Sequence, residues 1–287
     1  MVLSGEDSGN SRLQEKNPAL SLFVGPLVIF RNLKENTNLL WNFIQRDIRL
    51  KYRNSMIGYF WSLLEPLILS GVYYVLFMVI AGKTDPRYPL WVIIGVITWT
   101  FFSKSMNGGI ISLTRNGELI KQVYLPREIF AITNVGSNLI IACLSLLIVI
   151  PFMIYLEIGA TTQLYMVPLG LILVSCLGLG IGLLFSCLNT LNRDVEHLFR
   201  IVTRAGLFLS PVMWTIDMLP QSRQTILNYL MLNPMVVPIT MIRNGIDGSP
   251  LGIELNYIVY SVAFCVSSLL LGAMIFKRYE AETVKYL

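Results

Sequence analysis

The residues that could do chemistry in this sequence are few, and most lie within apolar runs. Glu65 is a carboxylate inside the apolar run 61–82 and is followed directly by Pro66. Because an acid in a membrane segment usually faces the protein interior or water, Glu65 is expected to have a partner. Further along, four polar side chains recur at helical spacing and form one face: Thr133, Asn134, Ser137 and Asn138. Such a face either bonds neighbouring helices together or lines a polar path, and the spacing leaves both alternatives open.

The sequence does not indicate catalysis at a metal or a nucleophile. The single histidine, His197, stands beside Asp194 and Glu196 and is more typical of a solvated residue than of a set of metal ligands. No G-x-x-x-x-G-K-[ST] loop is present, so energy for work on a substrate must come from elsewhere. The four cysteines lack C-x-x-C spacing and are expected to pack as small apolar residues: Cys143, Cys176, Cys187 and Cys265.

The composition indicates a membrane protein. Of the 287 residues, 54% are hydrophobic and 14% are charged, and the mean hydropathy is +0.63. Soluble domains carry about 25% charged residues, so this chain has too few polar side chains to cover a globule of its size. The net charge of +5 does not indicate nucleic-acid binding, because outside one short stretch no basic surface forms.

Apolar runs predict an all-α integral membrane protein with six transmembrane helices. They lie at about 61–82, 88–107, 128–156, 164–188, 197–215 and 255–276. All but four of the 22 lysines and arginines then fall on the side of the N-terminus, the exceptions being Lys83, Arg87, Arg223 and Arg243. Since cations gather on the cytoplasmic side, both termini are predicted to be cytoplasmic. The run 20–30 is too short to span and is expected to lie in the interface or to dock on the protein.

A basic stretch precedes the first span and has helical order. Trp41, Ile44, Ile48 and Tyr52 share one face, and the cations on another face are Arg46, Arg49 and Arg53. An aromatic-rich apolar face opposite a cationic face predicts a helix that lies in the headgroup plane. Asp47 and Lys51 are spaced as an i, i+4 ion pair.

Two further segments between spans have a recognisable pattern. The loop 112–130 predicts a short amphipathic helix that Asn116 and Gly117 begin and Pro126 ends. Its apolar side could face a soluble partner protein or the membrane surface, and its periodicity favours neither. The outer segment 217–247 predicts two short re-entrant or interfacial helices broken at Asn233–Pro234, because proline removes a donor and disfavours helix just before it.

Four stretches in this order resemble a known family. They are "RDIRLKYRNSMIGYFWSLLEPL", "NGELIKQVYLPREIF", "LSPVMWTIDMLP" and "LNPMVVPITMIRNGI". Together they resemble the permeases of type-two ABC exporters that secrete bacterial polysaccharides, which include O-antigen, capsule and teichoic-acid transporters. The resemblance covers residues 36–280 and implies a transmembrane domain at 36–287 that follows a cytoplasmic extension at 1–35.

The resemblance implies a multi-pass subunit of the bacterial plasma (inner) membrane that works as a homodimer. Two copies of a separate ATPase would bind ATP and Mg²⁺, so this chain would hold no cofactor and no metal. The substrate would be an undecaprenyl-linked glycan that crosses among membrane lipids, with no nucleic acid involved. The outer helices at 217–247 would narrow the exit.

The resemblance also implies roles for particular residues. The loop would contain the coupling helix that is seated in the ATPase: Asn116, Gly117, Glu118, Leu119, Ile120, Val123, Leu125, Pro126 and Arg127. The basic stretch would be the amphipathic interface helix, with gate residues Arg46, Asp47, Arg49, Arg53 and Trp61. Candidate channel residues are Glu65, Tyr73, Asn134, Asn138 and Trp214.

Two alternatives belong to other functions. One is a type-two ABC exporter of drugs or small lipids, against which the juxtamembrane "RDIRLKYR" and the paired "SP" and "NP" motifs argue. The other is an integral-membrane glycan-processing enzyme. Its catalytic acids would have to cluster at one membrane face, whereas Glu65, Glu157, Asp217 and Glu254 are scattered along the chain.

Overall fold

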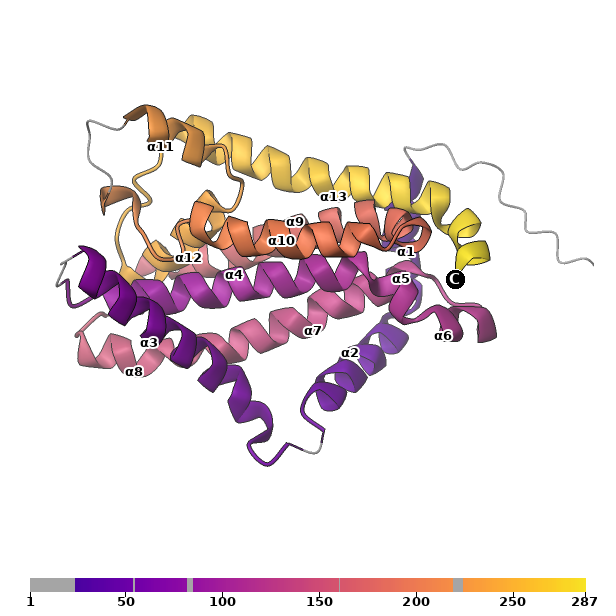
Figure 1. Cartoon of the computed structure of the whole chain (residues 1–287), viewed down its shortest axis with the longest axis horizontal. Coiled ribbons are helices and arrows are strands. Elements are labelled where there is room, and N and C mark those ends of the chain that lie inside the picture. The colour runs from indigo at the N-terminus through magenta and orange to yellow at the C-terminus, as the bar shows by residue number, and fades with distance from the viewer. Residues whose placement is uncertain (1–23, 54, 82–84, 160, 219–223) are drawn as a thin grey trace, which may run out of the picture.

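The computed structural model describes residues 24–287 except 54, 82–84, 160 and 219–223, and these residues form helices and no strand. Long helices run side by side along the longest axis of the molecule (Figure 1). The α-helices are α1 (Gly25–Glu35), α2 (Thr37–Lys51), α3 (Trp61–Ala81), α4 (Tyr88–Ile110), α5 (Ser112–Arg115), α6 (Gly117–Gln122), α7 (Glu128–Leu146), α8 (Val149–Tyr155), α9 (Met166–Leu191), α10 (Asp194–Leu209), α11 (Gln224–Met231), α12 (Val236–Asp247) and α13 (Leu255–Thr283). Short 3₁₀ turns are η2 (Gly58–Phe60), η3 (Thr162–Tyr165), η4 (Ile216–Met218) and η6 (Val284–Tyr286).

Five segments of the described chain are long and apolar enough to cross a membrane. They are Gly58–Leu76, Tyr88–Ile110, Glu128–Tyr155, Thr162–Leu191 and Leu255–Thr283, which confirms five of the six predicted spans. The remaining prediction, at 197–215, corresponds to α10, which has only 16 residues. At a rise of about 1.5 Å per residue such a helix is shorter than a hydrocarbon core of about 30 Å. The sixth crossing and the cytoplasmic location of both termini therefore stay predictions.

Helix α4 is the centre of the bundle, and small residues allow its neighbours to approach it. Gly109 of α4 faces Gly182 of α9 so closely that a Cβ on either would meet the other backbone at 2.9 Å. On another face of α9, Gly180 lies against Gly272 of α13. Gly178 of α9 likewise lies against Ser105 of α4, and such close contact between helices is what small residues permit.

A proline near the start of α3 explains one of its contacts. Pro66 lies within α3 and has no N–H to donate to the carbonyl four residues earlier, on Ser62. The hydroxyl of Ser145 on α7 lies 2.7 Å from that carbonyl and supplies the missing donor. The start of α3 is thereby fixed to the C-terminal end of α7.

Helix α2 docks on α7 through only part of its apolar face. Ile44 is buried against Gly136, and the rings of Phe43 and Phe130 lie 5.7 Å apart. Trp41 is half exposed. In Figure 1, α2 and α3 diverge from a turn below the bundle, so that together they form a V.

The outer segment forms two helices, α11 and α12, that are separated at Asn233–Pro234 as predicted. The Asn233 side chain accepts a bond from the Met235 N–H and donates one to the Ser210 hydroxyl. Arg243, counted above among the cations outside, is instead buried within α12. Its guanidinium donates to the carbonyls of Trp91, Pro211, Val212 and Trp214. Whether the two helices are re-entrant stays a prediction.

The part of the N-terminal extension that the structure describes docks on the bundle. In α1, Gly25 lies against Ala273 and Met274 of α13, and Ile29 is buried. Of the two alternatives for the run 20–30, its described part therefore favours docking on the protein. Residues 1–23 lie outside the described part of the chain.

Candidate functional site

A polar cavity of about 540 Å³ opens between α2, α4, α7 and α10. Its lining joins residues far apart in the sequence: Asp47, Leu50, Lys51, Lys104, Asn107, Gly108, Ile111, Arg115, Asn134, Ser137, Asn138, Ile141, Glu196 and Arg200. Three of the predicted site residues, Asp47, Asn134 and Asn138, therefore lie in one cavity. The cavity is wide enough to admit a polar headgroup.

Cations outnumber acids around this cavity. Its lining has four, Lys51, Lys104, Arg115 and Arg200, against Asp47 and Glu196. Glu196 pairs with Arg200, and Asp47 pairs at 2.8 Å with Arg46 rather than with Lys51. The predicted Asp47–Lys51 pair is therefore wrong. The guanidinium of Arg46 also lies 4.4 Å from the centre of the Phe43 ring, and this contact orients it toward its neighbour in sequence.

The partner expected for Glu65 is Lys104. The ammonium of Lys104 on α4 lies 3.0 and 3.1 Å from the two carboxylate oxygens of Glu65 on α3. Both side chains are more than a third exposed, so the pair is one that water and ligands reach. Lys104 also lines the main cavity, and the pair thus closes the cavity toward α3.

The polar face of α7 both bonds a neighbouring helix and lines the cavity. Asn134 donates to the carbonyl of Ser105 on α4 at 2.9 Å, and its side chain occupies the space that a Cβ on Gly108 would need. Asn138 donates in turn to the Asn134 side-chain oxygen at 3.2 Å. The first alternative, bonding between helices, is therefore confirmed, and that the cavity belongs to a polar path stays a prediction.

Lys51 has a lowered pKa at the mouth of the cavity. Desolvation, followed by the positive charge of Lys104, lowers the pKa of its ammonium to about 8, although part of the side chain is exposed. Lys51 is therefore charged below about pH 8 and loses its charge above it. The part of this shift that comes from Lys104 is repulsion between two cations of one cavity, and a bound anion would relieve it.

The other predicted gate and channel residues lie elsewhere. Arg49 and Arg53 are exposed and do not line the cavity. Trp61 lines a second, open cavity of about 550 Å³ that it shares with Glu65 and Lys51. Tyr73 packs against the main core. The Trp214 indole N–H donates to the Phe208 carbonyl, and Trp214 does not line the cavity.

The predicted coupling loop forms a shorter helix than expected. α6 begins at Gly117 as predicted but ends at Gln122, because Val123 is extended at φ −134° and ψ 133°. Pro126 therefore lies four residues beyond the helix end. The side away from the bundle is exposed at Glu118 and, most fully, at Tyr124.

The remaining loop residues divide between the bundle and solvent. Gly117 is buried, and Val123 is about half exposed. The half-buried residues of the loop are Asn116, Leu119, Ile120, Leu125, Pro126 and Arg127. The predicted apolar side therefore faces the bundle at Leu119 and Ile120 but not at Val123, and the loop presents an exposed surface of mixed polarity.

Sequence reasoning missed the cations that dominate the cavity. Lys104, Arg115 and Arg200 were counted only as charges on one side of the membrane. The signal that could have found Lys104 is its position within an apolar run, near Ser103, Ser105 and Asn107. A lysine so placed needs a partner or water. That this partner is Glu65, 39 positions earlier, appears only in three dimensions.

The chain was compared with known proteins. A family model described as "ABC-2 type transporter" matches residues 38–246, which include every residue that lines the cavity. The chain is 26% identical over 248 residues to the O-antigen export system permease protein RfbA of Klebsiella pneumoniae, covering 86% of this chain and 94% of that protein. The RfbA protein of Myxococcus xanthus is 26% identical over 213 residues, covering 72% and 80%. The polysialic acid transport protein KpsM of Escherichia coli is 27% identical over 249 residues, covering 82% and 91%.

Proposed function

We propose, from the premise that the chain belongs to the ABC-2 type transporter family, that it is the permease subunit of an exporter of a lipid-linked polysaccharide. The names of its relatives, an O-antigen export permease and a polysialic acid transport protein, support a glycan as the substrate. With several apolar helices, it is a multi-pass protein of the plasma (inner) membrane. The particular glycan and its lipid carrier, which the family resemblance implies is undecaprenyl, belong to this proposal.

The observation that carries the proposal is the cation-rich cavity between α2, α4, α7 and α10. A lipid-linked glycan joins an anionic phosphate to polar sugars, and the cavity offers both matching chemistries. Lys51, Lys104 and Arg115 attract the phosphate oxygens, while Asn134 and Asn138 supply amide groups for hydroxyls. Because the exposed Lys104–Glu65 pair opens at little cost, the substrate could pass toward α3.

ATP hydrolysis is assigned to a separate partner subunit. The exposed residues of the predicted coupling loop, from Glu118 in α6 to Tyr124 beyond its end, support this assignment because a soluble protein can reach them. Binding of ATP to the partner would favour one arrangement of the helices by contacts that differ between the two arrangements. Two copies of the chain and two ATPase subunits form the proposed transporter.

A second copy of this chain is proposed to complete the path. Helix α3 exposes an apolar stripe that includes Ile68, Val72 and Val75, and α10 exposes Ile201, Phe208 and Leu209. These exposed apolar faces suit lipid or the matching face of another protomer. Crosslinking of cysteines placed on α10 in native membranes tests this arrangement, and a chain that exports as a monomer would contradict it.

The function is tested by export from proteoliposomes. The chain, purified with its ATPase subunit, is expected to move a lipid-linked glycan across the bilayer only with ATP, and a strain without the chain is expected to retain that glycan inside. Export without any ATPase would contradict the proposal. An unchanged surface glycan in the deletion strain would instead favour the exporter of drugs or small lipids.

A further inference from the structure

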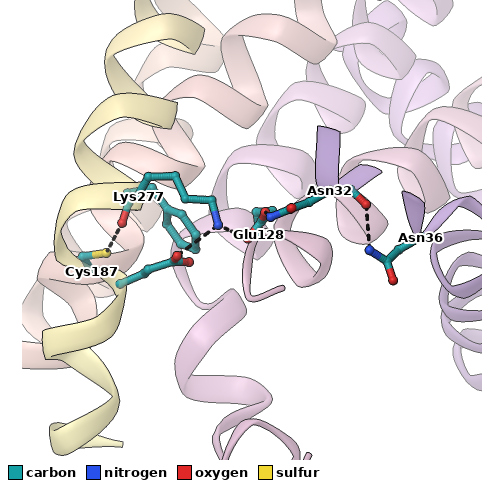
Figure 2. Close-up of polar contacts among 7 residues, drawn as sticks. Asn32, Asn36, Glu128, Cys187 and Lys277 are labelled. Carbon is teal, nitrogen blue, oxygen red and sulfur yellow. Dashed lines mark hydrogen bonds and ion pairs between the residues drawn. The ribbon is translucent and has the colours of Figure 1, made fainter. Parts of the chain in front are cut away.

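Helix α1 and the C-terminal part of α13 meet at the start of α7. Lys277, on the last third of α13, donates to a carboxylate oxygen of Glu128 at 2.7 Å and to Glu280 at 2.9 Å. Asn32 of α1 donates to the other oxygen of Glu128 at 2.8 Å. Figure 2 shows Lys277 and Asn32 reaching Glu128 from opposite sides. Three helices distant in sequence, α1, α7 and α13, are thus joined at one carboxylate.

This cluster is dry. The Glu128 side chain is fully buried, and the Lys277 side chain is 6% exposed. Removing one partner of a buried ion pair leaves an uncompensated charge without water, which is far costlier than separating a pair at the surface. Glu128 also lies in the first turn of α7, where the helix dipole favours its negative charge. The contact between α13 and the start of α7 is therefore stiff.

A second contact joins the segment that follows Lys277 to the segment that precedes Glu128. Leu287, the last residue, lies against Gly117, the first residue of α6, with its Cδ2 3.5 Å from the position of a Cβ there. Leu287 and Ile120 belong to one small apolar cluster that also includes Ile29, Leu113 and Phe276. The segment 277–287 therefore contacts the segment 117–128 at both ends, through a buried ion pair at one and an apolar contact at the other.

We propose that residues 277–287 and 117–128 move as one unit, and that Lys277 is the positioning residue that transmits a displacement of α6 to α13. Two separated contacts fix orientation as well as distance, whereas a single contact would act as a pivot. From α13 the displacement reaches α9 through the close approach of Gly272 and Gly180, and α9 packs on α4, which lines the cavity. This inference rests on the proposed function, because it assumes that a partner pushes on α6.

The test is the ratio of export to ATP hydrolysis in the reconstituted transporter. Lys277→Met is expected to lower export per ATP about tenfold or more, as expected for loss of a coupling free energy between sites, while hydrolysis continues. Lys277→Arg keeps the charge and is expected to restore most of the ratio. Lys285→Met removes an exposed lysine of the same tail and serves as the matched control with an unchanged ratio.

A second variant separates coupling from folding. Leu287→Asp places a charge on Gly117 at the end of the chain, where it leaves the helix bundle intact, and is expected to lower the ratio in the same direction but less. If Lys277→Met does not assemble, the export-to-hydrolysis ratio of Leu287→Asp tests the inference. Wild-type ratios in Leu287→Asp and in any Lys277→Met that assembles would overturn the inference. A wild-type complex that exports no glycan would instead overturn the proposed function.

Discussion

Two lysine–glutamate pairs of the same chemistry lie in two very different parts of this molecule. Lys104 and Glu65 join α4 to α3 beside the cavity, and their side chains are 37% and 48% exposed. Lys277 and Glu128 join α13 to α7 and are 6% and 0% exposed. An exposed pair contributes about 0–1 kcal/mol, whereas breaking a buried one costs about 3–5 kcal/mol. The first pair suits a place that opens for a substrate, and the second suits a link that must not open.

The largest expected effect is the loss of the buried pair. Lys277→Met should lower the free energy of unfolding by about 3–5 kcal/mol, because Glu128 would remain buried without its cation. The measurement is chemical denaturation of the purified chain in detergent. Replacing both partners, Lys277→Met with Glu128→Leu, should recover part of the loss, since the fully buried carboxylate is removed and only Glu280, whose side chain is 12% exposed, has lost its cation. If Lys277→Met were as stable as the wild type, the buried pair would contribute no more to stability than the exposed pair.

A smaller effect is expected at Asn134, which both bonds α4 and lines the cavity. Asn134→Ala should lower the free energy of unfolding by about 1 kcal/mol through loss of its bond to the Ser105 carbonyl. Asn138→Ala is the matched control, because the Asn138 amide donates to Asn134 of its own helix and not to α4, and it should cost less. Export should fall in both if both line the path. If export fell only in Asn134→Ala, this face of α7 would serve helix packing and not the path of the substrate.

Smaller again is the expected effect of the exposed pair on stability. Lys104→Met should change the free energy of unfolding by less than about 1 kcal/mol, because the pair is screened by water. Export should nevertheless fall, since Lys104 lines the cavity. Lys104→Arg, which retains the charge, is the control. If Lys104→Met lost as much stability as Lys277→Met, the exposure of a pair would not determine its contribution to stability.

The smallest expected effect is a pH dependence at Lys51. Its pKa is lowered to about 8 by desolvation and by Lys104, so its ammonium is charged at pH 7 and largely neutral at pH 9. Binding of a lipid with a phosphate headgroup should therefore weaken as the pH rises through about 8. Lys51→Arg keeps its charge throughout and should flatten the profile. Equal profiles for both proteins would exclude Lys51 as the titrating group.

Sequence patterns predicted the helices better than their contacts. Apolar length located α3, α4, α7, α9 and α13, because a membrane-crossing helix needs a run that is visible in one dimension. The same criterion overestimated the length of α10. The apolar run continues past the last helical residue, Leu209, into the turn at 210–214. The prediction that Pro126 ends α6 placed the helix end too late, because the chain is already extended at Val123.

The candidate site was predictable only in part. Asn134 and Asn138 were found because their spacing repeats on one helix. The i, i+4 pattern of Asp47 and Lys51 misled, because Asp47 instead pairs with Arg46, which the Phe43 ring holds in place. No sequence pattern indicated that Lys104 meets Glu65, since these residues belong to different helices whose packing decides the distance.

The sequence by itself determined that this chain is a helical membrane protein of a polysaccharide-exporter type, because hydropathy, proline positions and short motifs are local properties. Only the tertiary structure decided which charged side chains are exposed to solvent and which are buried. Glu65 and Glu128 are both carboxylates near the start of a predicted span, and their local sequence does not tell which of them is buried. One is exposed beside the open cavity, while the other is enclosed by α1, α7 and α13. Burial depends on what packs around a residue, and that is fixed by contacts between segments far apart in the chain.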